Sequence, residues 1–144
     1  MSSTPVIVAY TYQAPIQKVW EALTDAARMK AWYFDIADFR PEPGFKFGFV
    51  VTNEGKIYDH RCEVLEATAP NKLTYSWRYE GYPGLSVVTF ALQALTAETT
   101  QLRLTHSGLD TFPADQPAFS AASFTAGWQH ILGTSLADYV ITGA

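Results

Sequence analysis

The middle of the chain alternates between apolar and polar residues with a period of two, the pattern of a half-buried β-strand. It is clearest at residues 72–79, where Leu73, Tyr75, Trp77 and Tyr79 take every second position and polar residues lie between them. Similar segments, separated by turn residues, occupy the ranges 5–12, 45–51, about 57–65, 85–94 and 99–107. Their short connections predict about six strands in a mostly antiparallel sheet.

Apolar residues recur at intervals of three and four in other parts of the chain, which indicates amphipathic helices. After the first strand, Ala14-Pro15 leads into a short helix, and Asp25 is suited to cap a second one that reaches Trp32. A long helix is predicted over about residues 118–142, with apolar positions at Trp128, Ile131, Leu132, Leu136, Tyr139 and Val140. Two short helices therefore follow the first strand, and a long one follows the last.

This order of elements predicts an α+β fold, because an antiparallel sheet with helices on one face must bury the apolar side of both. We expect a helix-grip arrangement, in which a curved antiparallel sheet of about six strands wraps around the long C-terminal helix. The 144 residues contain no internal repeat and no linker-like tract, so residues 1–144 are expected to form a single domain. Strong curvature predicts a space between the sheet and the helix.

Composition narrows the classes of function. Aromatic residues make up 15% of the chain, charged residues 17% and hydrophobic residues 48%, which excludes intrinsic disorder. The net charge of −4 disfavours nucleic acid and anionic membranes as partners. Cys62 is the only cysteine, so no intramolecular disulfide is needed. Without a secretory signal or an apolar run of the ~20 residues that span a bilayer, we expect a soluble, cytoplasmic protein with no membrane insertion.

The aromatic row in residues 72–79 is the strongest functional signal. If Tyr75, Trp77 and Tyr79 point into the concave side of the sheet, their hydroxyls need partners, because an unpaired buried hydroxyl costs ~1–3 kcal/mol. Together with Trp128 and Tyr139 of the long helix, they predict an aromatic-lined pocket for a flat or partly apolar ligand. The alternative interpretation is a core that these rings fill.

His106 is the candidate for chemistry inside such a pocket. It shares a strand face with Leu102 and Leu104 and is expected to point inward. It would then be a general base, a hydrogen-bond partner of a ligand, or a core histidine satisfied by a neighbouring backbone group. The three histidines are too scattered for a metal-ligand spacing, so no metal is predicted.

Charged residues alternate with apolar ones on the third strand, at Asp59, Arg61 and Glu63. This face would suit a polar ligand if it were concave, but a solvated convex face is the interpretation that we favour. Glu21 on the first helix is also expected to face solvent. The chain has no Gly-rich phosphate loop and no nucleophile elbow, so phosphoryl, acyl and hydride transfer have no support.

Short motifs follow one another along nearly the whole chain, at residues 14–15, 19–25, 43–47, 64–66, 88–90, 102–108 and 127–128, together with Trp32, Pro70, Leu73, Trp77, Leu132 and Leu136. In this order they resemble the START-like helix-grip (SRPBCC) superfamily and, within it, the small bacterial homologues of the activator of heat-shock protein 90 ATPase. The sequence departs from the pattern at Tyr33, where many relatives have a second Trp, and at Cys62, where Gly is common.

The resemblance implies a hydrophobic cavity, which relatives use for lipid transport, small-molecule sensing or cyclase chemistry. The expected ligand-binding residues are Trp32, Phe47, Tyr75, Trp77, Tyr79, His106, Trp128, Leu132 and Tyr139. We therefore expect the chain to bind a small hydrophobic or aromatic molecule, a lipid or a metabolite, without a cofactor. The alternatives are a cyclase, dehydratase or hydrolase that uses the same cavity, and a modulator of the chaperone ATPase. A homodimer and a chaperone contact are further partner hypotheses.

Overall fold

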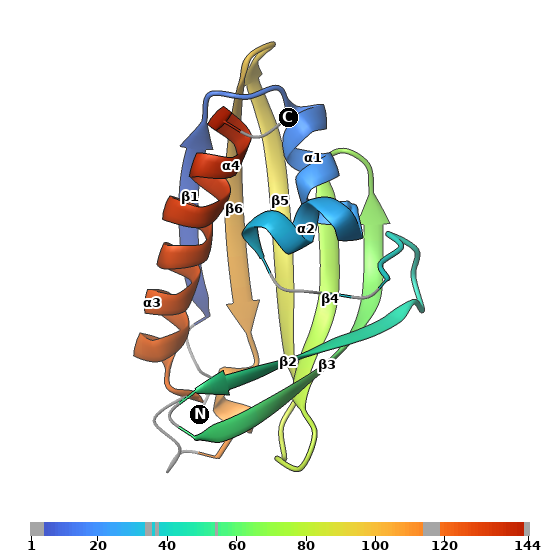
Figure 1. Ribbon diagram of the computed structural model, residues 1–144, viewed down its shortest axis with the longest axis vertical. Coiled ribbons are helices and arrows are strands. Elements are labelled where there is room, and N and C mark those ends of the chain that lie inside the picture. The colour runs from blue at the N-terminus through green and yellow to red at the C-terminus, as the bar shows by residue number, and fades with distance from the viewer. Residues whose placement is uncertain (1–4, 34–35, 37, 54, 114–118, 143–144) are drawn as a thin grey trace.

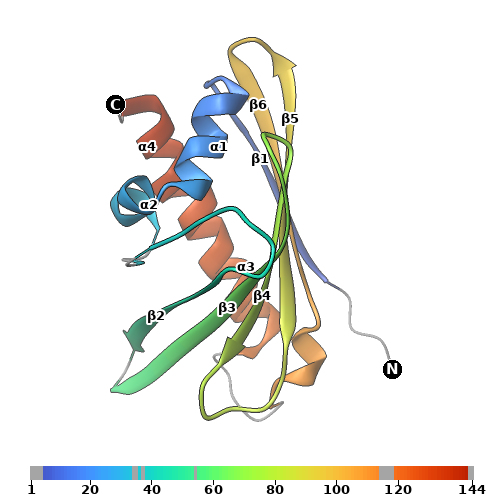
Figure 2. The same ribbon diagram turned by 90° about the vertical axis from the view of Figure 1, so that its right-hand side faces the viewer.

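The computed structural model describes residues 5–33, 36, 38–53, 55–113 and 119–142. In this part of the chain one sheet is covered on one face by helices (Figures 1 and 2). Its strands are β1 (Val6–Tyr12), β2 (Lys46–Asn53), β3 (Lys56–Thr68), β4 (Lys72–Tyr79), β5 (Ser86–Thr96) and β6 (Thr99–Ser107). The helical elements are α1 (Ile16–Thr24), α2 (Ala26–Trp32), the 3-10 turn η1 (Leu109–Thr111), α3 (Ala121–His130), the π-helical segment η3 (Ile131–Leu136) and α4 (Ala137–Thr142).

The sheet confirms the predicted α+β helix-grip class. Its six strands lie in the order β1-β6-β5-β4-β3-β2, and every neighbouring pair is antiparallel. β4 has the predicted bounds, whereas β3 continues beyond its predicted end to Thr68. A register shift between Val64 and Glu66 lets β3 remain paired with β4 along this extra length. The β2–β3 hairpin sweeps obliquely across the lower end of the sheet in Figure 1, which closes one side of the concave face.

The predicted cap of the second short helix is confirmed. The carboxylate of Asp25 accepts hydrogen bonds from the backbone N–H groups of Ala27 at 2.9 Å and Arg28 at 3.4 Å, which fixes the start of α2. The indole N–H of Trp32 donates to the carbonyl oxygen of Ala22 at 2.9 Å and so ties the end of α2 back to α1. The helices therefore form one unit over the concave face of the sheet.

The C-terminal helix differs from the regular helix that the sequence predicted, because η3 interrupts it with π-helical turns. Its predicted start at residue 118 lies outside the described residues. The buried positions recur at strict intervals of four, at Phe124, Trp128, Leu132, Leu136 and Val140. In a regular α-helix each four-residue step turns the side chain about 40° around the axis. The wider π turns reduce this drift, so all of these side chains stay on the side of the sheet.

The core lies between the concave face of the sheet and the helices, while the convex face carries charged side chains and some exposed apolar ones. The exposed fraction of the side chain is 46% for Glu21 and 52% for Arg61, which confirms that both face solvent. Among the helices of the described residues, none is long and apolar enough to cross a membrane. The functional question therefore concerns two surfaces of the sheet, the enclosed inner face and the open outer face.

Candidate functional site

The inner face of β4 carries the aromatic row that the sequence singled out. Alternation along the strand turns Tyr75, Trp77 and Tyr79 toward the helices, with exposed fractions of 1%, 4% and 5%. The predicted inward orientation of this row is confirmed. Its neighbours on the same strand, Ser76 and Arg78, point to the outer face and are more exposed.

The row is the centre of a cluster of rings from the sheet and the C-terminal helix. The ring of Phe47 meets that of Tyr75 edge-on at 5.0 Å between centroids. The ring of Trp77 meets Trp128 of α3 at 5.5 Å, and Tyr79 stacks on Phe119 at 4.6 Å. The fold thus brings together five of the predicted ligand-binding residues, Phe47 of β2, Tyr75, Trp77 and Tyr79 of β4, and Trp128 of α3.

Polar groups of the cluster pair with each other. The hydroxyls of Tyr33 and Tyr75 lie 2.8 Å apart, and the indole N–H of Trp77 donates to the hydroxyl of Tyr79 at 2.9 Å. Burial raises the pKa of the Tyr75 phenol far above its ordinary value, so this group is a neutral donor at neutral pH. Among the described residues no buried side-chain N or O atom lacks a hydrogen-bond partner.

His106 is fully buried and links the helix to the sheet. The indole N–H of Trp128 donates to its Nδ1 at 3.0 Å, and its Nε2 lies 2.8 Å from the hydroxyl of Ser86. That hydroxyl donates in turn to the carbonyl oxygen of Trp77 at 2.8 Å. His106 is thus satisfied by two side chains, not by the backbone group that the sequence analysis considered.

The directions of these bonds fix the proton of His106 and limit its chemistry. Because Nδ1 accepts a hydrogen bond from Trp128, the proton lies on Nε2 and points at the oxygen of Ser86. Burial lowers the pKa of His106 to about 3, which keeps the ring neutral. A general base that activates a serine needs the opposite arrangement, with a free lone pair on Nε2. The pair therefore serves as a structural link in this geometry.

Three predicted site residues lie at the edge of the cluster or apart from it. The ring of Trp32 stacks on Tyr33 at 4.9 Å, but its N–H is already used within the short helices. Leu132 is fully buried, and its carbonyl oxygen accepts a hydrogen bond from the hydroxyl of Tyr12 at 2.8 Å. Tyr139 is half-buried, and its side chain hydrogen-bonds with Arg28 of α2.

Three residues of the cluster were not among the predicted site residues. Tyr33 follows the end of α2, Phe119 precedes α3, and His60 lies on β3, where it stacks on Phe49 with 4.2 Å between centroids. Burial lowers the pKa of His60 to about 4. The alternation of His60 with exposed charges on β3 was a usable signal for its inward orientation. Tyr33 follows the predicted second helix, and Phe119, within the predicted range of the long helix, is not one of its four-residue apolar positions, so no periodicity identifies either ring.

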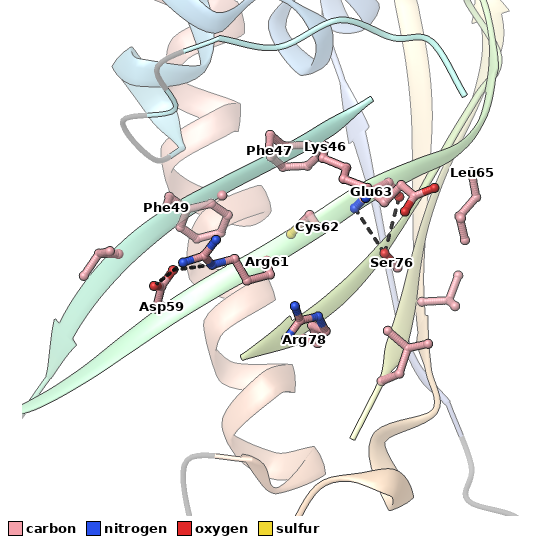
Figure 3. A pocket seen from close by; sticks show the side chains of 14 residues that line it. Lys46, Phe47, Phe49, Asp59, Arg61, Cys62, Glu63, Leu65, Ser76 and Arg78 are labelled. Atoms are coloured by element: carbon pink, nitrogen blue, oxygen red, sulfur yellow. Dashed lines mark hydrogen bonds and ion pairs between the residues drawn. The ribbon is translucent and has the colours of Figure 1, made fainter. Parts of the chain in front are cut away.

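A hollow of about 940 Å³ lies against the other side of the sheet (Figure 3). Outward-facing positions of β2 to β5 form most of its lining, and buried positions of β2 and β3 border it. The charged and polar lining residues are Lys46, Asp59, Arg61, Glu63, Ser76 and Arg78. The others are Phe47, Gly48, Phe49, Val50, Cys62, Leu65, Leu85 and Val87. The charged outer face thus has a concave part, which the sequence analysis did not favour.

No group of three or more His, Cys, Asp or Glu side chains within the described ranges is placed to hold a metal ion. Cys62 is buried, and burial raises the pKa of its thiol far above the ordinary value, so it is not a reactive thiolate. The chemistry available inside the sheet is therefore aromatic stacking and hydrogen bonding by neutral hydroxyl and indole groups.

Comparison with known proteins places this arrangement in a family. The sequence matches the family described as Activator of Hsp90 ATPase homolog 1-like protein over residues 13–140. No curated protein matches the chain. Among solved structures, DynU16, a protein in the dynemicin biosynthetic locus, is 27% identical with a TM-score of 0.77. The match covers 98% of this chain and 48% of DynU16, so this chain spans about half the length of that protein.

Two further solved structures share the fold. CalU16 from Micromonospora echinospora is 28% identical with a TM-score of 0.71, over 94% of this chain and 75% of CalU16. The Aha1 dimer from Colwellia psychrerythraea is 20% identical with a TM-score of 0.70, over 98% of each chain, a likeness that shows the fold alone. Because the family match extends over most of the sequence, the chain belongs to the family of Activator of Hsp90 ATPase homolog 1-like proteins.

Proposed function

We propose that this protein binds a small, flat aromatic molecule that carries a hydroxyl or carbonyl oxygen, in the interior between β4 and α3. One observation carries this proposal, the position of the Tyr33 ring. It lies nearly parallel to the rings of Trp32, at 4.9 Å and 26°, and of Trp128, at 6.3 Å and 21°. Its hydroxyl lies 2.8 Å from the hydroxyl of Tyr75. The Tyr33 side chain thus occupies the place that an aromatic ligand would take.

Tyr33 can leave this place more easily than the other rings can. It caps the end of α2, whereas Tyr75 and Trp77 are held within a central strand of the sheet. The residue as a whole is partly exposed, while Tyr75 and Trp128 have exposed fractions of only 1% and 2%. A ligand ring that replaced it would stack on Trp128 and restore the hydrogen bond of Tyr75. The likeness to DynU16, from a biosynthetic locus, is consistent with a small organic ligand.

The Tyr75 hydroxyl predicts selectivity for oxygen-bearing ligands. When Tyr33 leaves, the buried oxygen of Tyr75 loses its partner, which costs about 1–3 kcal/mol unless the ligand supplies a new one. An aromatic hydrocarbon can stack but cannot supply that partner. We therefore expect a phenol to bind about 10-fold or more tightly than a hydrocarbon of similar shape.

Calorimetric titration of 2-naphthol and 2-methylnaphthalene into the protein tests the proposal. We expect 2-naphthol to bind the wild type more tightly, and Tyr75→Phe to remove most of this preference. Tyr82→Phe is the matched control, because the Tyr82 hydroxyl makes no hydrogen bond with the described residues. Equal affinity of the wild type for both probes, or an unchanged preference in Tyr75→Phe, would contradict the proposal. So would an absence of 2-naphthol binding to both the wild type and Tyr33→Ala.

The family description supports a second candidate function, stimulation of the Hsp90 ATPase. The ATPase rate of purified Hsp90 with and without this protein measures it, and an unchanged rate would reject it. Light scattering of the same preparation gives the oligomeric state, which tests the homodimer hypothesis. Ligand binding in the interior predicts no particular ATPase result, so the two candidate functions can be judged separately.

A further inference from the structure

The hollow on the outer face is crossed by a row of three residues from adjacent strands. Gly48 of β2 lies opposite Arg61 of β3, which in turn lies opposite Arg78 of β4. A Cβ atom at Gly48 would lie 2.6 Å from the backbone oxygen of His60, so a side chain does not fit there without a backbone shift. No side chain from position 48 therefore covers Arg61 at this end of the row.

The lining of the hollow includes three cationic side chains, although the protein is acidic overall. Of the ten Lys and Arg residues in a chain of net charge −4, three line the hollow, Lys46, Arg61 and Arg78. Like charges directly opposite each other on a sheet, as Arg61 and Arg78 are, destabilise it. An arrangement that costs stability and faces a hollow is typical of a binding site.

The surrounding carboxylates do not satisfy all three cations. The carboxylate of Asp59 accepts two hydrogen bonds from the guanidinium of Arg61, from Nε at 3.1 Å and from Nη2 at 3.0 Å. Arg78 makes only a long contact of 3.7 Å with Glu80 and no side-chain hydrogen bond with the described residues. Lys46 lies opposite Glu63 on the sheet, and the two make no ion pair within the described part of the chain. Arg78 and Lys46 thus keep hydrogen-bond donors for another anion.

Apolar side chains lie beside these donors. Val50, Leu65 and Leu85 all line the hollow and have exposed fractions of 60%, 47% and 52%. Val87 on the central strand β5 adds a further apolar position to the lining. A ligand that used both kinds of surface would need an anionic group for the cations and an apolar body for the valines and leucines.

We propose that the outer face of β2 to β5 is a second binding site, separate from the interior, for a small organic anion. Its carboxylate, sulfonate or phosphate group binds Arg78 and Lys46, and its apolar body lies over Val87 and Leu85. Arg61, which is hydrogen-bonded to Asp59, forms one edge of the site. This proposal does not depend on the interior site, because the two use opposite faces of the sheet.

Fluorescence titration with 8-anilino-1-naphthalenesulfonate tests the proposal, with its uncharged parent N-phenyl-1-naphthylamine as the matched probe. We expect Arg78→Ala to weaken binding of the sulfonate about 10-fold, the loss of one charge-assisted hydrogen bond, and to leave binding of the parent unchanged. The control is Arg103→Ala, an exposed arginine on β6 that does not line the hollow. An equal loss in both variants, or none in Arg78→Ala, would overturn the proposal.

The position of the probe is a second readout. In amide NMR spectra, the sulfonate should shift the signals of Lys46, Ser76 and Val87 more than those of Trp128 and Leu132. 2-Naphthol, the probe of the interior, should not displace it. Displacement by 2-naphthol, or shifts centred on α3, would mean that the sulfonate binds inside, which would overturn the outer site and leave the interior proposal in place.

Discussion

The two faces of β4 differ in how their polar groups are held. On the inner face, Trp77 and Tyr79 are hydrogen-bonded to each other, the groups are neutral, and the partners are fixed. On the outer face, Arg78 reaches Glu80 only at 3.7 Å, and both side chains are about half exposed. On the inner face, a ligand must therefore match the positions of the fixed hydrogen-bonding groups, because an unpaired buried group is costly. The outer face can exchange partners at little cost, because water replaces any contact that is lost.

Removal of the Trp77 ring from the inner face should have the largest effect on stability. The Trp77 ring contacts Phe49 at 5.6 Å and Trp128 at 5.5 Å and is 4% exposed. We expect Trp77→Ala to lower the free energy of unfolding by ~3–5 kcal/mol, measured by urea denaturation. Leu85→Ala on the outer face, where the side chain is 52% exposed, should change it by no more than ~0.5 kcal/mol. Similar losses in both variants would refute the distinction between the faces.

A lower pH should have the second largest effect on stability, through the two buried histidines of the inner face. Burial lowers the pKa of His106 to about 3 and that of His60 to about 4, while unfolded histidine titrates near pH ~6.5. Below pH ~6.5 the unfolded chain binds protons that the folded chain does not, so stability falls as the pH decreases toward these lowered values. Each histidine contributes up to ~1.4 kcal/mol per pH unit.

Denaturation at several pH values between 7 and 4 measures this effect. Carboxylates also titrate in this range, so the useful quantity is the difference in slope between the wild type and His106→Gln. We expect the free energy of unfolding of His106→Gln to depend less steeply on pH than that of the wild type, by the contribution of one histidine. An identical slope would show that His106 takes up a proton as readily in the folded as in the unfolded chain, which would contradict the hydrogen bond that its Nδ1 accepts from Trp128.

Removal of a single buried hydroxyl from the inner face should lower stability by an intermediate amount. Tyr12→Phe removes the donor to the Leu132 carbonyl oxygen in the π-helical segment, and we expect a loss of ~1–2 kcal/mol in the free energy of unfolding. Tyr10→Phe, on the same strand, removes a hydroxyl that makes no hydrogen bond with the described residues, so it should cost at most ~0.5 kcal/mol. Thermal denaturation of both variants checks the difference, and equal losses would count against a role for this bond.

The smallest effect is expected for the outer ion pair. Arg61 binds Asp59 with two hydrogen bonds, but its side chain is 52% exposed, so Arg61→Ala should cost less than ~1 kcal/mol. The difference from the wild type should shrink further in 1 M salt, because salt screens exposed charges. A loss of several kcal/mol would mean that the outer charges hold the fold together, in contrast to the comparison drawn above.

The class of the fold and the inner row of β4 could be predicted because both depend on a regular period. The two-residue spacing of Tyr75, Trp77 and Tyr79 predicted that they share one face of β4. Asp25, as a predicted N-cap, marked the boundary between the two short helices. The family resemblance, carried by the order of its motifs, is confirmed by the match over residues 13–140.

The parts that sequence did not predict depend on relations between elements. Tyr33 reaches the cluster from the end of a helix, and no repeat indicates which ring fills the space beside Tyr75. The hollow on the outer face is lined by residues of four strands, so it depends on how the strands lie in space, which an alternation of charges along one strand does not reveal. The ligand-binding roles of the predicted residues remain predictions that the titrations above address.

The four-residue interval between Trp128 and Leu132 has a mechanical consequence. A helix that rests only on rings could slide or rotate at little cost, because apolar contact has no preferred direction. Here the N–H of Trp128 is tied to β6 through His106, and the carbonyl of Leu132 is tied to β1 through Tyr12, one turn further along. Two directional attachments to two strands fix both the rotation and the axial position of the helix. The helix therefore does not shift to admit a ligand, and in the proposed binding mode the room comes from the side chain of Tyr33.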